Sequence, residues 1–406
     1  MFKIVLKNYL TNFLVFDKQK VCNYLVLIQT CFTGIAYNVV EIPFIVYTII
    51  AYSTSFLYIL LSFGKHIRYI WLFSIPIIYF LVNLFWSTGT GYFKFDFINI
   101  LMICQLLLLY RNDKKWVIQN FRKYIIIMSL LGIICYLSFY LNLGIPYSLK
   151  SYYVTRFEAY YVNYHFSYLF SDPEAVTPRL CGLYNEPGYF GTILALVLIL
   201  DNCKLKKKGN ICIFIAAIFT WSLAFWLILI LFFIIRYIKN YKYSLTLLSS
   251  LFIFIYIANN VQFENPQLNI LLERFQFEDG KLKGDNRTTS VFDNIYDGFI
   301  DSNDKYFGWG SNALTLRYDD LGTLSYKTFI INYGIIGFLI LWGVPFICSL
   351  FYAKLRWKPI VFILLFFIST YQRPHLYTNL FITILFGGID YILNLKSSFN
   401  SLKFNE

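Results

Sequence analysis

Residues 179–200 read RLCGLYNEPGYFGTILALVLIL, where a polar, glycine-containing stretch passes directly into an uninterrupted apolar run. Apolar runs near the ~20 residues that cross the hydrocarbon core of a bilayer recur along the whole chain. Hydrophobic residues make up 58% of the 406 residues and charged residues only 14%, against about a quarter charged in a soluble protein. The composition therefore predicts an all-α, polytopic membrane protein, and the N-terminus shows no removable signal peptide.

Basic residues gather in short segments, which the positive-inside rule places on the cytoplasmic side. These segments are 3–20, 65–68, 111–123, 204–208, 236–242, 354–358 and 396–403. Neighbouring segments on one side require an even number of crossings between them. The chain is therefore expected to form a single integral membrane domain over 1–406, with about 12 transmembrane helices and both termini cytoplasmic. The net charge of +13 reflects this topology, and no nucleic-acid partner is expected.

One apolar segment, 210–236, is longer than a single span requires. One crossing would carry Arg236 outside and reverse every later span. Two short half-spans that break near Thr220–Ser222 keep the basic residues on one side. A broken helix at membrane depth is tolerated where it is buried in protein or lines a cavity. The other spans are expected near 22–38, 43–63, 68–86, 95–110, 121–141, 188–202, 244–260, 326–352, 358–370 and 376–395.

Two long polar segments, about 142–187 and 261–325, are expected to be large external loops. Loops of this length without structure of their own are either functional or disordered, and their aromatic content argues against disorder. Of eight cysteines only Cys181 lies in them, so no external disulfide and no zinc site is expected. The spans are nearly free of charge, since Asp96 and Asp390 are expected near span ends, and this weakens a proton-coupled carrier.

The entry to the span at 188 combines Arg179, Glu186 and Pro187. Proline suits the first turn of a helix, which places Glu186 at or near the N-cap. The positive end of the helix dipole favours the ionised carboxylate there. Two interpretations stay open. Glu186 is either a cap that pairs with Arg179, or a carboxylate held at the membrane boundary to accept a proton from a hydroxyl.

The second loop carries Arg274 and Arg287 among acidic neighbours. A surface pair with Glu273 or Glu278 explains Arg274 as well as a functional role does. Small polar neighbours around Arg287 favour function, because the planar guanidinium binds diphosphate oxygens in a bidentate manner. The FGWGSN stretch that follows (307–312) places two glycines around an aromatic residue, a turn where backbone can closely approach a ligand.

Three aromatic residues near these segments, Tyr184, Tyr189 and Trp309, can stack on sugar rings, although membrane-interface aromatics look the same. The last outer turn, YQRPHLYT, holds Arg373 and His375. Arg373 either extends its charge from a helix end to the membrane–water interface or binds a ligand, and the sequence favours neither. His375 is either a proton acceptor or a structural histidine.

These elements, taken in chain order, resemble the Wzy-type O-antigen and capsular polysaccharide polymerases, within the superfamily that also holds the O-antigen ligases. The resemblance covers about residues 120–395. The matching elements are R-x-x-G-x-x-x-E-P-G-x-F at 179–190, the T-x-S of Thr220–Ser222, Arg287 with Gly298, FGWGSN, and YGIIGFLILW at 333–342.

The resemblance implies polymerisation of undecaprenyl-diphosphate-linked oligosaccharide repeat units by a metal-independent glycosyltransferase without a cofactor. Glu186, Arg179 and Arg287 would be catalytic, with arginines stabilising the departing diphosphate. The enzyme would lie in the bacterial cytoplasmic (inner) membrane among its lipids, with its active site on the periplasmic side. Flippase and chain-length regulator proteins would be its partners.

Two alternatives remain. Ligases of the superfamily carry a histidine in the second loop, and the corresponding stretch LGTLSYKTFIINYG (321–334) has none, which disfavours an O-antigen ligase-type glycosyltransferase. A lipid-linked oligosaccharide flippase would need charges along a central cavity through its spans, whereas here the charges are expected at one face.

Overall fold

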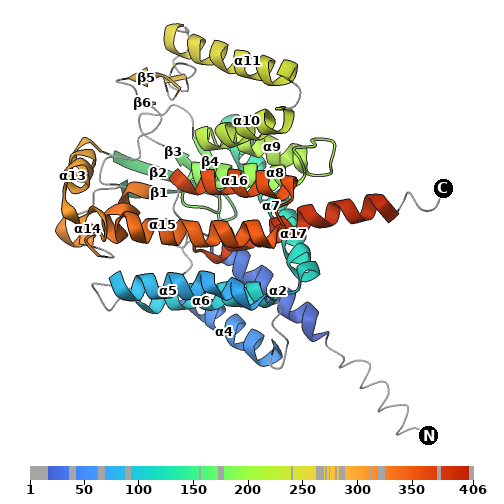
Figure 1. The fold of residues 1–406 in the computed structure, drawn as a ribbon. Coiled ribbons are helices and arrows are strands. Elements are labelled where there is room, and N and C mark those ends of the chain that lie inside the picture. Colours follow the sequence, from blue (N-terminus) through green and yellow to red (C-terminus); the bar gives the residue numbers. More distant parts are fainter. Residues whose placement is uncertain are drawn as a thin grey trace, which may run out of the picture.

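The computed structural model is a bundle of helices with a small β-sheet at one end (Figure 1). It describes residues 17–35, 43–62, 69–86, 93–154, 157–171, 178–238, 241–261, 269, 272–273, 275–278, 281–282, 289–310, 313–318, 325–372 and 376–401. The helices are α2 (Lys18–Phe32), α4 (Phe44–Ser62), η1 (Ile70–Phe73), α5 (Ser74–Trp86), α6 (Phe93–Leu108), α7 (Arg111–Leu141), α8 (Pro187–Leu200), α9 (Asn210–Phe219), α10 (Leu223–Tyr237), α11 (Tyr241–Asn260), α13 (Ser290–Asp301), η2 (Asn303–Lys305), α14 (Ala313–Arg317), α15 (Tyr326–Tyr352), α16 (Trp357–Gln372) and α17 (Asn379–Ser401).

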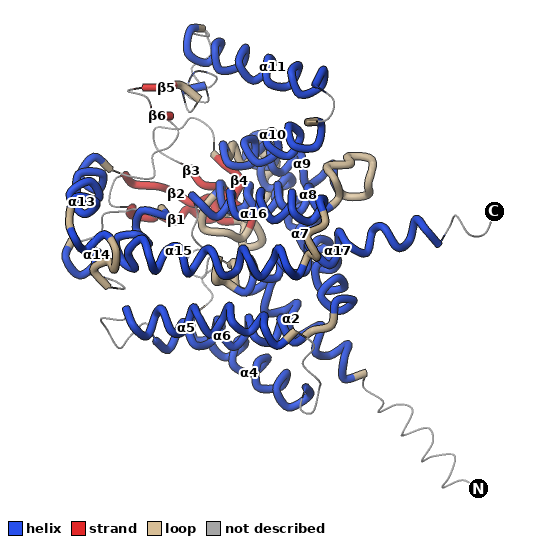
Figure 2. The backbone as a smooth tube through the Cα atoms, viewed as in Figure 1, coloured by secondary structure: helices blue, strands red, loops and turns tan. Residues whose placement is uncertain are grey.

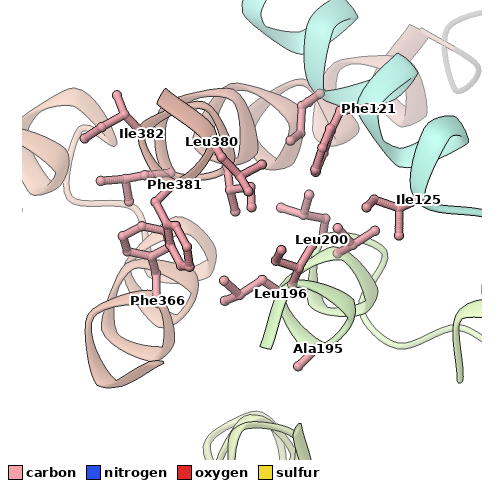
Figure 3. Packing of buried hydrophobic residues seen from close by; sticks show 14 of the residues in the cluster. Phe121, Ile125, Ala195, Leu196, Leu200, Phe366, Leu380, Phe381 and Ile382 are labelled. Atoms are coloured by element: carbon pink, nitrogen blue, oxygen red, sulfur yellow. The ribbon is translucent and has the colours of Figure 1, made fainter. Parts of the chain in front are cut away.

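Helix α8 is the centre of the bundle, because it is apolar on all sides and every residue except Tyr189 is buried. Figure 3 shows Leu196 and Leu200 of α8 near side chains of the surrounding helices, with Ala195 on the opposite side of α8. Those neighbours come from α7, α16 and α17, and the labelled ones are Phe121, Ile125, Phe366, Leu380, Phe381 and Ile382. Residues 187–200, the apolar part of the stretch 179–200, therefore form the centre of the hydrophobic core.

Within the described residues, three helices are long and apolar enough to cross a membrane, namely Ile45–Ser62, Arg111–Leu141 and Tyr326–Tyr352. Shorter apolar helices lie in the other expected spans except 22–38, where α2 is not among the apolar helices. The predicted break in 210–236 is confirmed, because α9 ends at Phe219 and α10 begins at Leu223. Asp390 lies four residues before the end of the apolar segment Asn379–Asn394 of α17, near a span end as predicted.

The first long loop contains a folded β-sheet, so the expectation of an all-α chain holds only for the bundle. Strands β1 (Ser148–Val154), β2 (Phe157–Asn163), β3 (Tyr168–Ser171) and β4 (Arg179–Gly182) form an antiparallel sheet in the order β1-β2-β3-β4. Tyrosine, phenylalanine and valine dominate the pairing strands, and these residues favour β-structure. Two short strands, β5 (Phe277–Glu278) and β6 (Lys281–Leu282), pair separately.

Strand β4 packs inside the end of the bundle. Leu180 is fully buried and lies on Gly132 of α7, where a Cβ atom would come within 2.9 Å of the leucine Cδ1. At about 1.5 Å per residue, Gly132 lies about 14 Å inside the end of α7 at Leu141. The absent side chain of Gly132 thus lets an extended strand enter between helices. This entry carries Arg179 to the break between α9 and α10.

The FGWGSN turn lies against the backbone of α15, where a Cβ on Gly308 would overlap the Gly334 nitrogen. The close approach of a ligand there stays a prediction. Helix α15 is interrupted at Gly334, whose φ is 69°. The segment before it docks on this interruption, with the Trp309 amide donating to the Ile331 carbonyl (2.8 Å) and the Gly310 amide to the Asn332 carbonyl (2.9 Å). A Cβ on Gly334 would overlap the Tyr306 carbonyl. Glycine is needed here for close approach of two backbones at positive φ.

Candidate functional site

The break between α9 and α10 is a short turn formed by Thr220, Trp221 and Ser222. Trp221 adopts the left-handed conformation with φ 48°, which stops the helix. The Ser222 hydroxyl accepts the Phe225 amide at 3.3 Å and caps α10, while the Thr220 hydroxyl accepts the Ser222 amide at 3.3 Å. The hydroxyls of the T-x-S element therefore hold the break open, and two carbonyls at the end of α9 are left without helical partners.

Arg179 binds those two carbonyls from the end of β4. Its Nε donates to the Thr220 carbonyl at 3.2 Å, and an Nη donates to the Trp221 carbonyl at 3.3 Å. A cation at a helix C-terminus also interacts favourably with the helix dipole. The arginine is only partly buried, so a fixed positive charge lies at the break.

Helix α8 begins beside the same turn, and its sequence determines where it starts. Pro187 occupies the first turn, as predicted, and Glu186 is the N-cap residue. The Glu186 carbonyl accepts the Tyr189 and Phe190 amides at 3.1 and 3.2 Å. Its carboxylate, however, makes no capping hydrogen bond. The side-chain cap is therefore not formed, although the position of Glu186 at the helix start was right. The pairing of Glu186 with Arg179 and its role as a proton acceptor both stay predictions.

Gly191 brings α8 against the break. A Cβ on Gly191 would lie 2.5 Å from Cβ of Ser222 and 3.0 Å from the Thr220 hydroxyl. Glu186 begins the same helix about 7 Å farther along its axis. We call Arg179, Glu186, Gly191 and the turn 220–222 the break site. It unites an arginine, a carboxylate and the N-terminus of a buried helix, a combination that attracts anions and can accept a proton.

Tyr184 and Tyr189, expected to stack on sugars, pack next to this site. Tyr184 is 1% exposed, and its ring lies 5.5 Å from Tyr189 and 5.4 Å from Phe190. Burial raises the pKa of the Tyr184 phenol well above its ordinary value of 10.0. Tyr189 is half-buried and meets Phe381 edge-on at 5.6 Å. Tyr184 therefore helps hold the start of α8 in place and has no exposed face for a sugar in this structure.

Trp309 belongs to a separate hydrophobic cluster with Phe292, Phe299 and Ile331. Its indole donates to an Asp304 carboxylate oxygen at 3.0 Å. The Phe299 ring meets it edge-on at 5.2 Å, and the Arg317 guanidinium lies 4.4 Å from its ring centre. These contacts hold the second long loop together around FGWGSN. The remaining predicted site residues, Arg274, Arg287, Arg373 and His375, lie outside the described residues.

The C-terminal end of α8 lies next to a buried charged group that was not predicted from the sequence. The buried Asp201 carboxylate accepts from Arg122 Nε (2.7 Å), the Tyr391 hydroxyl (2.7 Å) and Lys207 Nζ. Arg122 also donates to the Asn210 side chain at 2.7 Å. We call these residues the Asp201 cluster. Figure 2 shows the loop between α8 and α9 at the end of the molecule opposite the strands.

A second buried charged group joins α7, α15 and α17. The Tyr352 hydroxyl donates to Asp390 at 2.5 Å, and the Arg111 guanidinium lies 3.5 Å from the other carboxylate oxygen. Lys114 is fully buried and donates to the Leu107 carbonyl at 3.3 Å. These partners are far apart in sequence and could not be paired from it. The only signal in the sequence was a carboxylate, Asp390, in an apolar segment. Arg111 and Lys114 belong to the basic segment 111–123 expected on the cytoplasmic side, and Asp390 lies near the end of its apolar segment, so this charged group joins helix ends.

Among the described residues, no group of three or more His, Cys, Asp or Glu side chains is arranged to hold a metal ion. Comparison with protein-family models, with curated proteins and with solved structures gave no match to this chain.

Proposed function

We propose that this chain is a membrane glycosyltransferase that polymerises lipid-linked oligosaccharide repeat units, with the break site as its centre. The observation that carries the proposal is the meeting of Arg179, the broken helix and the N-terminal end of α8 at one place. These are three of the elements on which the resemblance to Wzy-type polymerases rests. Irregular backbone inside a membrane bundle is tolerated where it is buried in protein or lines a cavity, and such places commonly bind substrate.

In this mechanism, a sugar hydroxyl of one repeat unit attacks the anomeric carbon of the chain held on a second carrier lipid. The new C–O bond forms as the bond to the diphosphate breaks, and undecaprenyl diphosphate leaves with the bonding electrons. The hydroxyl proton passes to the Glu186 carboxylate. Arg179, with Arg287 and Arg274 of the second loop, stabilises the negative charge that develops on the diphosphate.

The proposal includes the membrane arrangement expected from the sequence, with about 12 crossings and both termini in the cytoplasm. The break site would then face the outer side of the bacterial cytoplasmic membrane. The carrier lipids would lie between helices, with their sugars beneath the two long loops. Flippase and chain-length regulator proteins would supply and control this reaction.

Buried charges inside the helices give the flippase alternative a specific basis. Arg111, Lys114 and Asp390 are buried as transporter charges would be, but they lie near helix ends and contact one another and Tyr352. A translocation path would need these charges to face the passing sugar. We therefore favour the enzyme, in which this charged group joins helices.

The deciding experiment is deletion of the gene, followed by gel analysis of surface and carrier-linked glycan. A polymerase mutant loses the ladder of long chains and keeps a single attached repeat unit. A ligase mutant loses all attached glycan while polymer collects on the carrier lipid. A flippase mutant instead collects single repeat units on the carrier at the cytoplasmic side.

Two substitutions then test the site in the complemented strain. Glu186→Gln and Arg179→Lys should each lower polymer output by about 100-fold or more, as removal of one transition-state donor does in other enzymes. Arg236→Lys is the matched control, because Arg236 also donates to a carbonyl, that of Asn202, but at the other end of α8. Full ladders from both site variants at normal protein level would refute this assignment.

A further inference from the structure

A continuous row of aromatic rings leads away from the break site along the end of α7. Phe219, the last residue of α9, stacks on Tyr136 with ring centres 4.2 Å apart. Tyr136 lies 5.0 Å from Tyr140, and Tyr140 lies 6.2 Å from Phe139. Tyr147 continues the row 6.0 Å from Phe139. Each ring contacts the next, so the row connects the break to the surface.

The row of rings begins next to the turn that contacts Arg179. The Trp221 carbonyl accepts from the Arg179 guanidinium, and the Trp221 indole donates to the Tyr136 hydroxyl at 3.3 Å. The predicted diphosphate-binding arginine and Tyr136, the second ring of the row, therefore share Trp221 as a partner. A molecule bound at Arg179 by its charged end would have the rings directly beside it.

The far end of the row is open to the surroundings. Tyr140 is 42% exposed and Tyr147 49% exposed, whereas Tyr136 is almost fully buried. The connecting segment NLGIPY, residues 142–147, carries no charge. Exposed aromatic faces without neighbouring charges suit sugar rings, which present apolar C–H faces and neutral hydroxyls.

We propose that Tyr140 and Tyr147 form a carbohydrate-binding track that holds the growing glycan between successive additions. The inference rests on the proposed function and adds a subsite to it. Two weak stacking positions on one tethered chain raise the effective concentration of the chain end at the break site. Stacking on a ring tolerates different sugar orientations. The glycan can therefore advance by one repeat unit while it stays in contact with Tyr140 or Tyr147. The track therefore sets how many units are added before the polymer leaves.

The test is the double substitution Tyr140→Ala/Tyr147→Ala, expressed in the deletion strain at native protein level. Modal chain length on the surface-glycan gel should fall at least two-fold, while polymer of some length is still made. Tyr140→Phe/Tyr147→Phe should restore the native length, because stacking needs the ring and not the hydroxyl. The matched control is Phe252→Ala/Tyr256→Ala on α11, where the two rings are 70% and 67% exposed.

The outcomes separate this proposal from the one on which it rests. If gene deletion leaves the ladder intact, the proposed function fails. If deletion abolishes the ladder but the Tyr140/Tyr147 alanine variant keeps native chain length, the track is refuted and the polymerase stands. Equal shortening by the α11 control also refutes the track, because both pairs would then act as interface aromatics only.

Discussion

At the C-terminal end of α8, the Asp201 carboxylate is surrounded by an arginine, a lysine and a tyrosine that all donate to it. At the N-terminal end, the Arg179 guanidinium instead binds two backbone carbonyls of a broken helix. The first end pairs opposite side-chain charges inside the protein. The second attaches a cation to the carbonyl end of a broken helix. The comparison indicates that one end of α8 holds the bundle together, and we propose that the other binds an anion.

The largest effect is expected at the C-terminal end. Asp201→Asn removes the charge that pairs with Arg122, whose side chain is only 13% exposed. Breaking a buried ion pair from one side costs about 3–5 kcal/mol of unfolding free energy. Thermal unfolding of the purified protein in detergent measures this loss. Polymer made per unit of folded protein should stay unchanged.

Lys204→Gln is the control for this prediction, because Lys204 is exposed on the same loop. It should change stability by less than about 0.5 kcal/mol. If Asp201→Asn instead lowers polymer output per folded protein as strongly as Arg179→Lys, the division of roles between the two ends is wrong.

A smaller loss of stability is expected from Gly191→Ala at the other end of α8. The added methyl group would lie 2.5 Å from Cβ of Ser222, and such overpacking costs about 1–3 kcal/mol. The added methyl group should also displace the turn 220–222. Polymer made per unit of folded protein should therefore fall as well. The double variant Gly191→Ala/Ser222→Gly removes the clashing side chain and should recover part of the stability. Additive losses in the double variant would contradict direct contact.

Ser222→Ala tests the cap that begins α10. The serine hydroxyl accepts the Phe225 amide, and losing such a cap costs about 1 kcal/mol. Chemical denaturation in detergent should detect a loss of this size. Ser222→Thr keeps the hydroxyl and should keep the cap, with any loss confined to its added methyl group beside Gly191. A Ser222→Ala protein of native stability would show that the hydroxyl does not hold the break.

The smallest effect is expected from Trp221→Phe. The change keeps a ring but removes the indole donor to the Tyr136 hydroxyl, a bond of about 0.5–1.5 kcal/mol. Polymer length should shorten slightly, because the row of rings loses its link to the turn that holds Arg179. Tyr136→Phe removes the acceptor of the same bond and should match it. Different chain lengths from the two variants would argue against that link.

The helices and the break could be predicted from the sequence because they depend on local properties. Apolar runs near 20 residues specify the helices, and the basic residues after 210–236 required an interruption near Thr220. Pro187 likewise marked the start of α8. The break site was predicted in part, since Arg179 and Glu186 were selected together although the partners of Arg179 were not.

What could not be predicted depends on contacts between distant residues. Asp201 meets Tyr391 across 190 positions, and Gly334 needs to be a glycine because residue 306 lies against it. The sheet is an intermediate case. Its tyrosine-rich strands had β-forming composition, but membrane-interface tyrosines look the same in a sequence.

The entry of β4 between the helices also determines an order of events during biosynthesis. Arg179 is made 42 residues before Trp221, so at about 5–20 residues per second it waits roughly 2–8 s for its carbonyl partners. Asp201, by contrast, follows Arg122 by 79 residues and precedes Lys207 by only 6. The residues of the ion pairs at the C-terminal end of α8 are therefore all synthesised before Thr220 and Trp221. The break site is completed later, when the partners of Arg179 at the N-terminal end of α8 have been made.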